Sequence, residues 1–446
     1  MTEPAAASAR AELAARASYG RLLAVLAAPT RDIAGAEDAL ADAFERALRT
    51  WPEAGVPHNP EAWLLTVARN RQRDELGSAA RRTSVALDVL ESTGTLEPVR
   101  PPAASTSVGD PARPAGASVD PADLDLDALP DKRLELLFVC AHPAIDPAVR
   151  TPLMLQTVLG FDATQIAAAF AVPAPAMAQR LVRAKRRIRD AGIPFAVPDR
   201  TAMAARLPPV LEAVYGCYAI DWHRVSGETL RDSLSGEALY LATTLAELLP
   251  DEPEVQGLAA LLCLSLARTE ARTGPAGEHV PLAEQHTALW DRALIARGES
   301  HLRRAHARAV AARPGSTAAG FGRFQLEAAM QSVHCARAAT GETDWRTLRT
   351  LNEALVRVAP TLGAQVSLAA TIAEVDGPEA GLVHLDSLRE GAEGAAFERF
   401  QPAWATRAHL LAAAGRTAEA SAASAKAISL TTDARLRAHL QAQSWQ

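Results

Sequence analysis

The residues best suited to chemistry in this sequence are cations, crowded into "AMAQRLVRAKRRIRDAG", from Ala176 to Gly192. The stretch holds six basic residues against one acid, although the whole chain has a formal net charge of -6 and a pI near 6.0. Arginine and lysine bind phosphates and, in the major groove of DNA, the edges of guanine. Salt confines a charge's influence to roughly 10 Å, so a locally basic helix can bind a polyanion within an acidic protein. The plainer alternative is a solvated helix face.

The spacing of apolar residues in this stretch predicts an amphipathic helix. Met177, Leu181, Ala184 and Ile188 recur at intervals of three or four and form an inward stripe. The remaining polar and basic residues are then available to a partner. The candidate DNA contacts are Gln179, Arg180, Arg183, Lys185, Arg186 and Arg187.

A short helix is predicted just before the basic one. In "GFDATQIAAAFAV", Asp162 precedes Gln165 by three residues, which is a capping-box arrangement. We expect Ile166, Ala169 and Phe170 on its buried side and a break at 172–175. A capped helix, a tight turn and a second helix with a basic outer face are typical of a helix-turn-helix, whose second helix enters the major groove. This context favours DNA over solvent as the partner of the basic helix.

Two further helices are predicted near the N-terminus. "AGAEDALADAFERALRTWP" places Leu40, Phe44, Ala47 and Leu48 on one face and acids on the other. The second helix is predicted in "HNPEAWLLTVARNRQRDEL", where Asn59 is the N-cap and Pro60 is the first helical residue. The end of that helix carries a basic cluster that the helix dipole explains only in part. Its members are Arg69, Arg71 and Arg73, followed by Arg81 and Arg82.

The chain is predicted to be all-α and to divide into three helical regions and one linker. Ala, Leu and Arg, which favour helix, dominate the composition, and aromatics reach only 4%. Residues 92–130 are rich in Pro, Ala, Ser and Gly and acidic towards their end, as in a flexible tether. The predicted domains are 1–91, 131–198 and 199–446. In the last, "LAAAGRTAEASAASAKAISL" has a tetratricopeptide-like rhythm, in which Gly415 ends one helix and alanines pack the next (Ala418, Ala422, Ala425).

Several classes of protein are disfavoured. No signal peptide or membrane span is indicated, so we expect a cytoplasmic protein. The four cysteines form no C-x-x-C pair and are expected to be buried free thiols. None of the eleven histidines sits in a ligand-spaced cluster, and no phosphate loop or nucleophile motif appears. We therefore expect no metal, no cofactor and no enzymatic activity. A pure scaffold would leave the basic helices unexplained.

Several segments of the sequence resemble a known family. "GAEDALADAFERALRTWPEAGVPHNPEAWLLTVARNRQRDEL" resembles region two of an extracytoplasmic-function (ECF) sigma factor. The segment 129–195, with "AHPAI" and "AMAQRLVRAKRRIRDAGIPF", resembles region four of one subgroup. That subgroup has a large tetratricopeptide-like C-terminal extension, which "LWDRALIARG" and "FQLEAAMQSVHCARAATGETDW" resemble. The resemblance covers nearly the whole chain.

The resemblance implies a role for each group of residues. The 37–48 helix would dock on core RNA polymerase through Glu37, Asp38, Asp42, Phe44 and Glu45. The next helix would open and read the downstream promoter element through Arg69, Asn70, Arg73, Arg81 and Arg82. Region four would read the upstream element through the candidate DNA contacts named above. The partners implied are promoter DNA, core RNA polymerase and a protein or intramolecular partner for the C-terminal array, with no membrane.

The sequence also departs from the family pattern. Ala41 stands before Asp42, where a Gln is expected in the docking helix, and the motifs expected in the extension are replaced by 218–225 and 273–287. The leading hypothesis is a sigma factor that directs promoter recognition and transcription initiation. The alternative is a sigma-like DNA-binding regulator that no longer engages polymerase productively.

Overall fold

The computed structural model describes residues 18–91, 132–170, 172–221, 233–275, 277–311, 320–431 and 433–442, without the side chains of 76–91, 200 and 221. Throughout this part of the chain the regular structure is helical, and the only strand-like pairing is an isolated bridge between Thr273 and His279. The predicted all-α fold is confirmed. The chain divides into two compact units, Met1–Ala213 and Val214–Gln446. The predicted linker, 92–130, lies outside the described residues.

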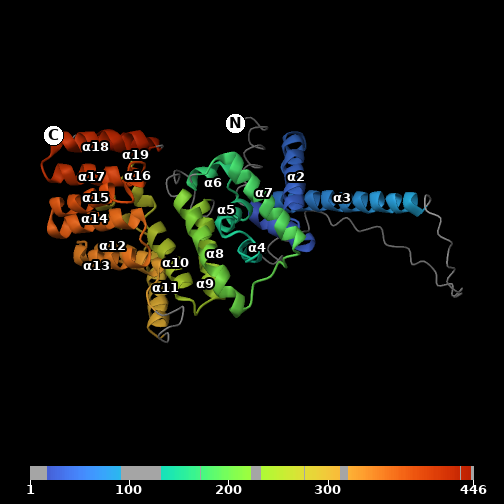
Figure 1. Cartoon of the computed structure of the whole chain (residues 1–446), viewed down its shortest axis with the longest axis horizontal. Helices are drawn as coiled ribbons and strands as arrows, with labels where there is room; N and C mark the ends of the chain where they lie inside the picture. The colour runs from blue at the N-terminus through green and yellow to red at the C-terminus, as the bar shows by residue number, and fades with distance from the viewer. Residues whose placement is uncertain are drawn as a thin grey trace. The chain divides into compact units, whose positions relative to one another are not determined.

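The N-terminal unit begins with a helix over residues 18–30, and α3 extends beyond the other helices (Figure 1). Its further helices are α2 (Ile33–Ala54), α3 (Pro60–Glu91), α4 (Arg133–Cys140), α5 (Pro147–Thr157), α6 (Ala163–Ala169) and α7 (Ala174–Asp190), and α8 (Arg200–Asp221) crosses into the second unit.

The predicted helix starts in this unit are confirmed. Asn59 Oδ1 accepts a hydrogen bond from the amide of Ala62 at 3.0 Å, and α3 begins at Pro60. Asp162 and Gln165 form the expected capping box at the start of α6. These starts were predictable because capping joins residues only two or three positions apart.

Two of the predicted buried faces are wrong in part. Leu48 is 51% exposed and Phe44 only half-buried, because α2 turns Leu40, Ala43 and Ala47 towards the core. In α6 the buried residues are Ile166 and Ala167. Ala169 and Phe170 are exposed, because the helix ends there and Phe170 occupies the C-cap.

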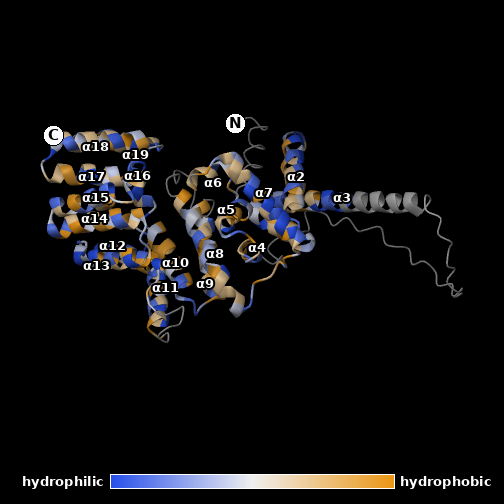
Figure 2. Cartoon of the chain, in the orientation of Figure 1, coloured by the Kyte–Doolittle hydropathy of each residue, from blue (hydrophilic) through white to orange (hydrophobic). Residues whose placement is uncertain are grey.

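The C-terminal unit is a succession of helices in which neighbours along the chain pack side by side (Figure 1). Hydrophobic and hydrophilic residues alternate along these helices (Figure 2), and α10 is buried over nearly its whole length. They are α9 (Leu234–Leu248), α10 (Pro253–Leu266), α11 (Arg292–Ala311), α12 (Arg323–Thr340), α13 (Trp345–Val358), α14 (Leu362–Asp376), α15 (Pro378–Glu390), α16 (Gly394–Phe397), α17 (Gln401–Ala413), α18 (Thr417–Leu430) and α19 (Ala434–Ala442). Short 3-10 turns, Glu270–Arg272, Leu282–Glu284 and Thr287–Leu289, lie between α10 and α11.

The turn between α17 and α18 matches the prediction, but the packed face does not. Gly415 has a φ of 75°, the left-handed conformation that ends a helix. The alanines that α18 buries are Ala420, Ala423 and Ala427. The predicted Ala418, Ala422 and Ala425 are exposed, because the side of α18 that faces α17 is set by that contact and not by the small-residue rhythm.

All four cysteines are free and buried, as predicted. Burial raises the pKa of the Cys140 thiol to about 12, so this group is not a nucleophile at neutral pH. Within the described ranges, none of the helices combines the length and apolar character needed to cross a membrane. The same residues contain no group of three or more side chains placed to hold a metal ion.

Candidate nucleic-acid and polymerase interfaces

The basic helix α7 is held against the N-terminal unit by its predicted apolar stripe. Met177, Leu181, Ala184 and Ile188 are all buried, at 7% exposure or less. Both α5 and α6 pack against this helix, and the chain passes from α6 to α7 within a few residues. The polar side is left to solvent, and Figure 2 shows it as a hydrophilic surface along α7.

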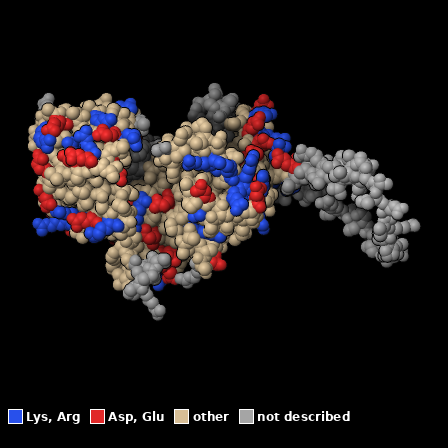
Figure 3. Space-filling model, viewed as in Figure 1, with Lys and Arg blue, Asp and Glu red and all other residues tan. Residues whose placement is uncertain are grey.

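The exposed side of α7 carries arginines without acidic partners. Arg180, Arg183, Arg186 and Arg187 are exposed, and no carboxylate of the described residues forms an ion pair with any of them. Figure 3 shows basic side chains gathered over this helix. Gln179 is exposed on the same helix. In a chain with more acids than bases, this unpaired charge is what a polyanion would attract. We call Arg180, Arg183, Arg186 and Arg187 the arginine face.

A hollow of about 460 Å³ lies beside the arginine face. It is lined by Arg180, Arg183, Ala184 and Arg187 of α7 and, around the start of α5, by Ala144, Ile145, Asp146, Ala148 and Val149. The preceding loop is fixed by Arg150, which donates to the carbonyls of Pro143 and Ile145. Three arginines and a single acid, Asp146, line this hollow, and the excess of positive charge suits a phosphate group of a nucleic acid backbone.

His142 helps to shape that loop. Its Nδ1 accepts a hydrogen bond from the amide of Ala144 at 3.1 Å, which requires that nitrogen to be unprotonated. Burial lowers the pKa of His142, and the charges of Arg206 and Arg150 lower it further. The neutral ring therefore persists at physiological pH and keeps the loop in place beside the hollow.

Lys185 was predicted to contact DNA, and the structure shows that this prediction is wrong. It is buried against α2, and its Nζ lies 2.6 and 2.5 Å from the two carboxylate oxygens of Glu37. Lys185 follows Leu181 by four positions and precedes Ile188 by three, so it sits at the edge of the apolar stripe. That spacing was a signal that sequence reasoning missed. In this arrangement Lys185 cannot contact DNA.

Most of the predicted polymerase-binding residues share one groove of about 590 Å³ along α2. Its lining combines acids with apolar side chains: Glu37, Asp38, Ala41, Phe44, Glu45 and Leu48 from α2, with Tyr19 and Gln156 from its neighbours. Asp42 lies elsewhere, because it pairs with Arg71 of α3 at 2.6 Å. Burial raises the pKa of Glu37, an effect that the adjacent Lys185 partly offsets. Sequence reasoning missed Tyr19 and Gln156, which reach the groove only through tertiary packing.

Only some of the predicted DNA-binding arginines of α3 lack an acidic partner. Arg71 is held by Asp42 and Glu75. Arg69 and Arg73 have no acidic partner among the described residues. The pKa of Arg69 is lowered, mainly by burial and to a smaller extent by the positive charge of Arg73. Asn70 is exposed beside them. Arg81 and Arg82 lie in α3, but their side chains are outside the described part. DNA contact by these residues stays a prediction.

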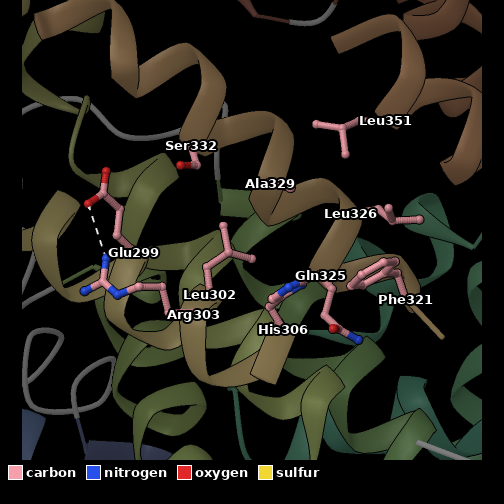
Figure 4. Close-up of a pocket in the computed structure, with 10 residues that line it drawn as sticks. All are labelled: Glu299, Leu302, Arg303, His306, Phe321, Gln325, Leu326, Ala329, Ser332 and Leu351. Carbon is pink, nitrogen blue, oxygen red and sulfur yellow. Dashed lines mark ion pairs between the residues drawn. The ribbon is translucent and has the colours of Figure 1, made fainter. Parts of the chain in front are cut away.

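The C-terminal unit has a separate, mostly apolar cavity of about 450 Å³ between α11, α12 and α13 (Figure 4). His306 stacks on Phe321 with ring centroids 5.5 Å apart, and Glu299 pairs with Arg303 at 3.8 Å. Leu302, Leu326, Ala329 and Leu351 add apolar side chains to the lining. This chemistry suits an apolar group of a partner or ligand.

Two family models match parts of the chain. Residues 15–82 match the sigma-70 region 2 family, and residues 206–306 match a family of unknown function (DUF6596). An uncharacterized protein of Rhizobium meliloti (strain 1021) is 33% identical over 414 residues, which cover 93% of this chain and 90% of that protein. No solved structure matches the chain significantly.

The fold and the matches define an all-helical protein whose N-terminal part is a sigma-70 region 2 domain. The chain belongs to one family with the Rhizobium meliloti protein along nearly its whole length. Its region 2 domain, residues 15–82, supports membership of the sigma-70 family. A region 2 domain implies a sigma-factor-like role in transcription initiation, through interaction with core RNA polymerase and promoter DNA.

Proposed function

We propose that this protein is a sigma factor of the extracytoplasmic-function type, which recruits core RNA polymerase to promoters. Region two, 1–91, would bind polymerase and the downstream element, and region four, 131–198, would read the upstream element as a helix-turn-helix. The tetratricopeptide-like extension, 199–446, would regulate the factor or bind partners. The protein would act in the cytoplasm and would have no enzymatic activity and no cofactor.

The observation that carries this proposal is the arginine face of α7. Its four arginines lack acidic partners among the described residues, although acids outnumber bases in the whole chain. The capped α6 just before it supports the proposal that α7 is the recognition helix of a helix-turn-helix. The sigma-70 region 2 match supports the assignment of the partner as promoter DNA in complex with polymerase.

The proposal is tested by transcription with purified core polymerase. The full chain should co-purify with core polymerase, and the pair should start transcripts from promoters mapped by genomic binding. Occupancy should be mapped for the protein and for polymerase at the same sites. Polymerase that starts the same transcripts without this chain would contradict the proposal.

The alternative is a DNA-binding regulator that no longer engages polymerase productively. Ala41, where a polar residue was expected, lines the α2 groove, and Lys185 already pairs with Glu37. Stable binding to promoter DNA without any polymerase association would select this alternative.

The α2 groove gives a sharper test of polymerase docking. Leu48 is 51% exposed and lines the groove, so Leu48→Glu should leave the fold intact while placing a charge in an apolar contact. We expect the affinity for core polymerase to fall about 10-fold or more, as it does when a central side chain of an interface is lost. The measurement is binding of labelled protein to core polymerase.

The matched control is Leu289→Glu, because Leu289 is also 51% exposed but lies in the C-terminal unit. Its affinity for polymerase should stay within about twofold of wild type, as expected for a surface change away from the contact. Equal losses in both variants would place polymerase docking elsewhere.

A further inference from the structure

The cavity between α11, α12 and α13 is kept open because two of its walls are anchored on a further helix. Both α11 and α12 pack on α10. A Cβ atom at Gly298 of α11 would lie only 2.7 Å from Cγ of Leu264 of α10. One at Gly257 of α10 would lie 2.7 Å from the amide nitrogen of Gln325 of α12. Glycine permits such close approach, so each wall is fixed on α10 and the space of about 450 Å³ is preformed.

The start of α12 is fixed further by a carboxylate of α10. Glu254 accepts hydrogen bonds from the amides of Phe324 at 3.0 Å and Gln325 at 3.2 Å, two donors that have no partner within their own helix. It also accepts from Nε2 of Gln325 at 3.1 Å. Gln325 is 4% exposed and lines the cavity. This wall is therefore ordered before any ligand binds, which lowers the entropic cost of binding.

The lining combines apolar side chains with one loosely paired cation. Figure 4 shows Arg303 at the end of the cavity opposite Phe321. Its acidic neighbour, Glu299, lies 3.8 Å away on the same helix, and the two side chains are 71% and 42% exposed. An exposed ion pair of this kind contributes little. Arg303 is therefore available to a carboxylate that accepts two hydrogen bonds from its guanidinium group.

The charge of α11 favours an anion at this end of the cavity. The helix carries five arginines and a single acid, Glu299. Arg308 pairs with Asp251, whereas Arg304, next to Arg303, is exposed without an ion pair among the described residues. This excess of positive charge attracts a negatively charged group. The mostly apolar lining disfavours a nucleic acid as the source of that group.

We propose that this cavity binds an amphipathic organic acid, a small molecule with an apolar or aromatic body and one carboxylate. The body lies among the apolar side chains of the three helices, and the carboxylate accepts hydrogen bonds from Arg303. The cavity volume falls within the range of about 300 to 1,000 Å³ in which proteins enclose small ligands. This inference goes beyond the proposed function, because it gives the C-terminal unit a ligand that it binds without polymerase or DNA.

The test uses two fluorescent probes that share one aromatic body. Anilinonaphthalene sulfonate carries an anionic group, which stands in for the carboxylate, and phenylnaphthylamine is the same molecule without it. Titration into the full chain measures the dissociation constant of each probe. In Arg303→Gln, affinity for the sulfonate should fall about 10-fold, as when a charged hydrogen bond is lost, and affinity for the neutral probe should change less than about twofold.

The matched control is Arg304→Gln, which removes the same charge at the adjacent position of α11, outside the cavity lining. It should change the affinity for either probe by less than about twofold, as a surface substitution away from the contact. A carboxylate is tested directly by competition. Decanoate should displace the sulfonate probe more strongly than decanol does, because the alcohol offers no charge to Arg303.

Ala329→Phe tests whether the cavity holds the aromatic body. Ala329 lines the cavity, and a phenyl ring there takes up its space, so affinity for both probes should fall at least about 10-fold. Ala338→Phe makes the same change at an exposed position of α12 outside the lining and should bind both probes as the wild type does. Phe321→Ala removes a lining ring that is 46% exposed, so it should fold normally and weaken both probes.

The outcomes separate the acid, the cavity and the proposed function. Equal effects of Arg303→Gln and Arg304→Gln on the sulfonate probe would overturn the acidic ligand. Wild-type affinities in Ala329→Phe, with the unfolding temperature of its control, would overturn the cavity as the site. If Ala329→Phe unfolds, unchanged affinity for both probes in Phe321→Ala has the same consequence. Neither polymerase nor promoter DNA enters these measurements, so their failure leaves the proposed function standing, and failure of the transcription test leaves this site standing.

Discussion

Reversing two charges of the arginine face, Arg183→Glu with Arg187→Glu, should abolish specific DNA binding while the protein stays folded. Both side chains are exposed and lack acidic partners among the described residues, so their loss removes no internal contact of that kind. Each lost phosphate contact makes the slope of log binding constant against log salt concentration shallower by about 0.9. Losing two contacts should therefore weaken binding about 30-fold at physiological salt. Repulsion by the new carboxylates adds to this loss.

Gel-shift titration of the full chain at several salt concentrations measures both the affinity and its slope. The control is Arg292→Glu with Arg297→Glu, which changes the net charge equally at two exposed positions of α11. The control should retain DNA binding with the wild-type slope. If both double variants lose the same affinity, the effect comes from total charge and the arginine face is not the contact.

Leu181→Asp should have the largest effect on stability. Leu181 is 1% exposed within the apolar stripe by which α7 packs on its neighbours. The substitution removes a buried aliphatic side chain and places a carboxylate inside the apolar stripe, where the cation one turn along the helix, Lys185, is already held by Glu37. Together these changes should lower the free energy of unfolding by about 4 kcal/mol or more. Urea unfolding followed by circular dichroism measures this loss.

The adjacent Val182 provides the control, because it lies on the same helix but is 50% exposed. Val182→Asp should lower the free energy of unfolding by less than about 0.5 kcal/mol, the usual range for surface changes. Similar destabilisation by both variants would show that α7 is not packed through the 177–188 stripe.

The start of helix α3, the capped start of α6 and the stripe of α7 could all be predicted from the sequence. Each depends on residues within one or two helical turns: Asn59 with Ala62, Asp162 with Gln165, and Leu181 with Ile188. At this range the covalent chain itself brings the interacting groups together. The exposure of the arginine face follows from the same periodicity, since its residues lie between those of the stripe.

The tertiary structure decided which side chains meet across helices. Lys185 lies on the edge of a stripe, where the helical period allows either burial or exposure, and only the position of Glu37 on α2 settles that it is buried. Leu48 and the alanines of α18 differ from prediction for the same reason. A periodic pattern determines the faces of one helix relative to one another. The neighbour that each face contacts depends on residues far away in the chain, which local spacing does not encode.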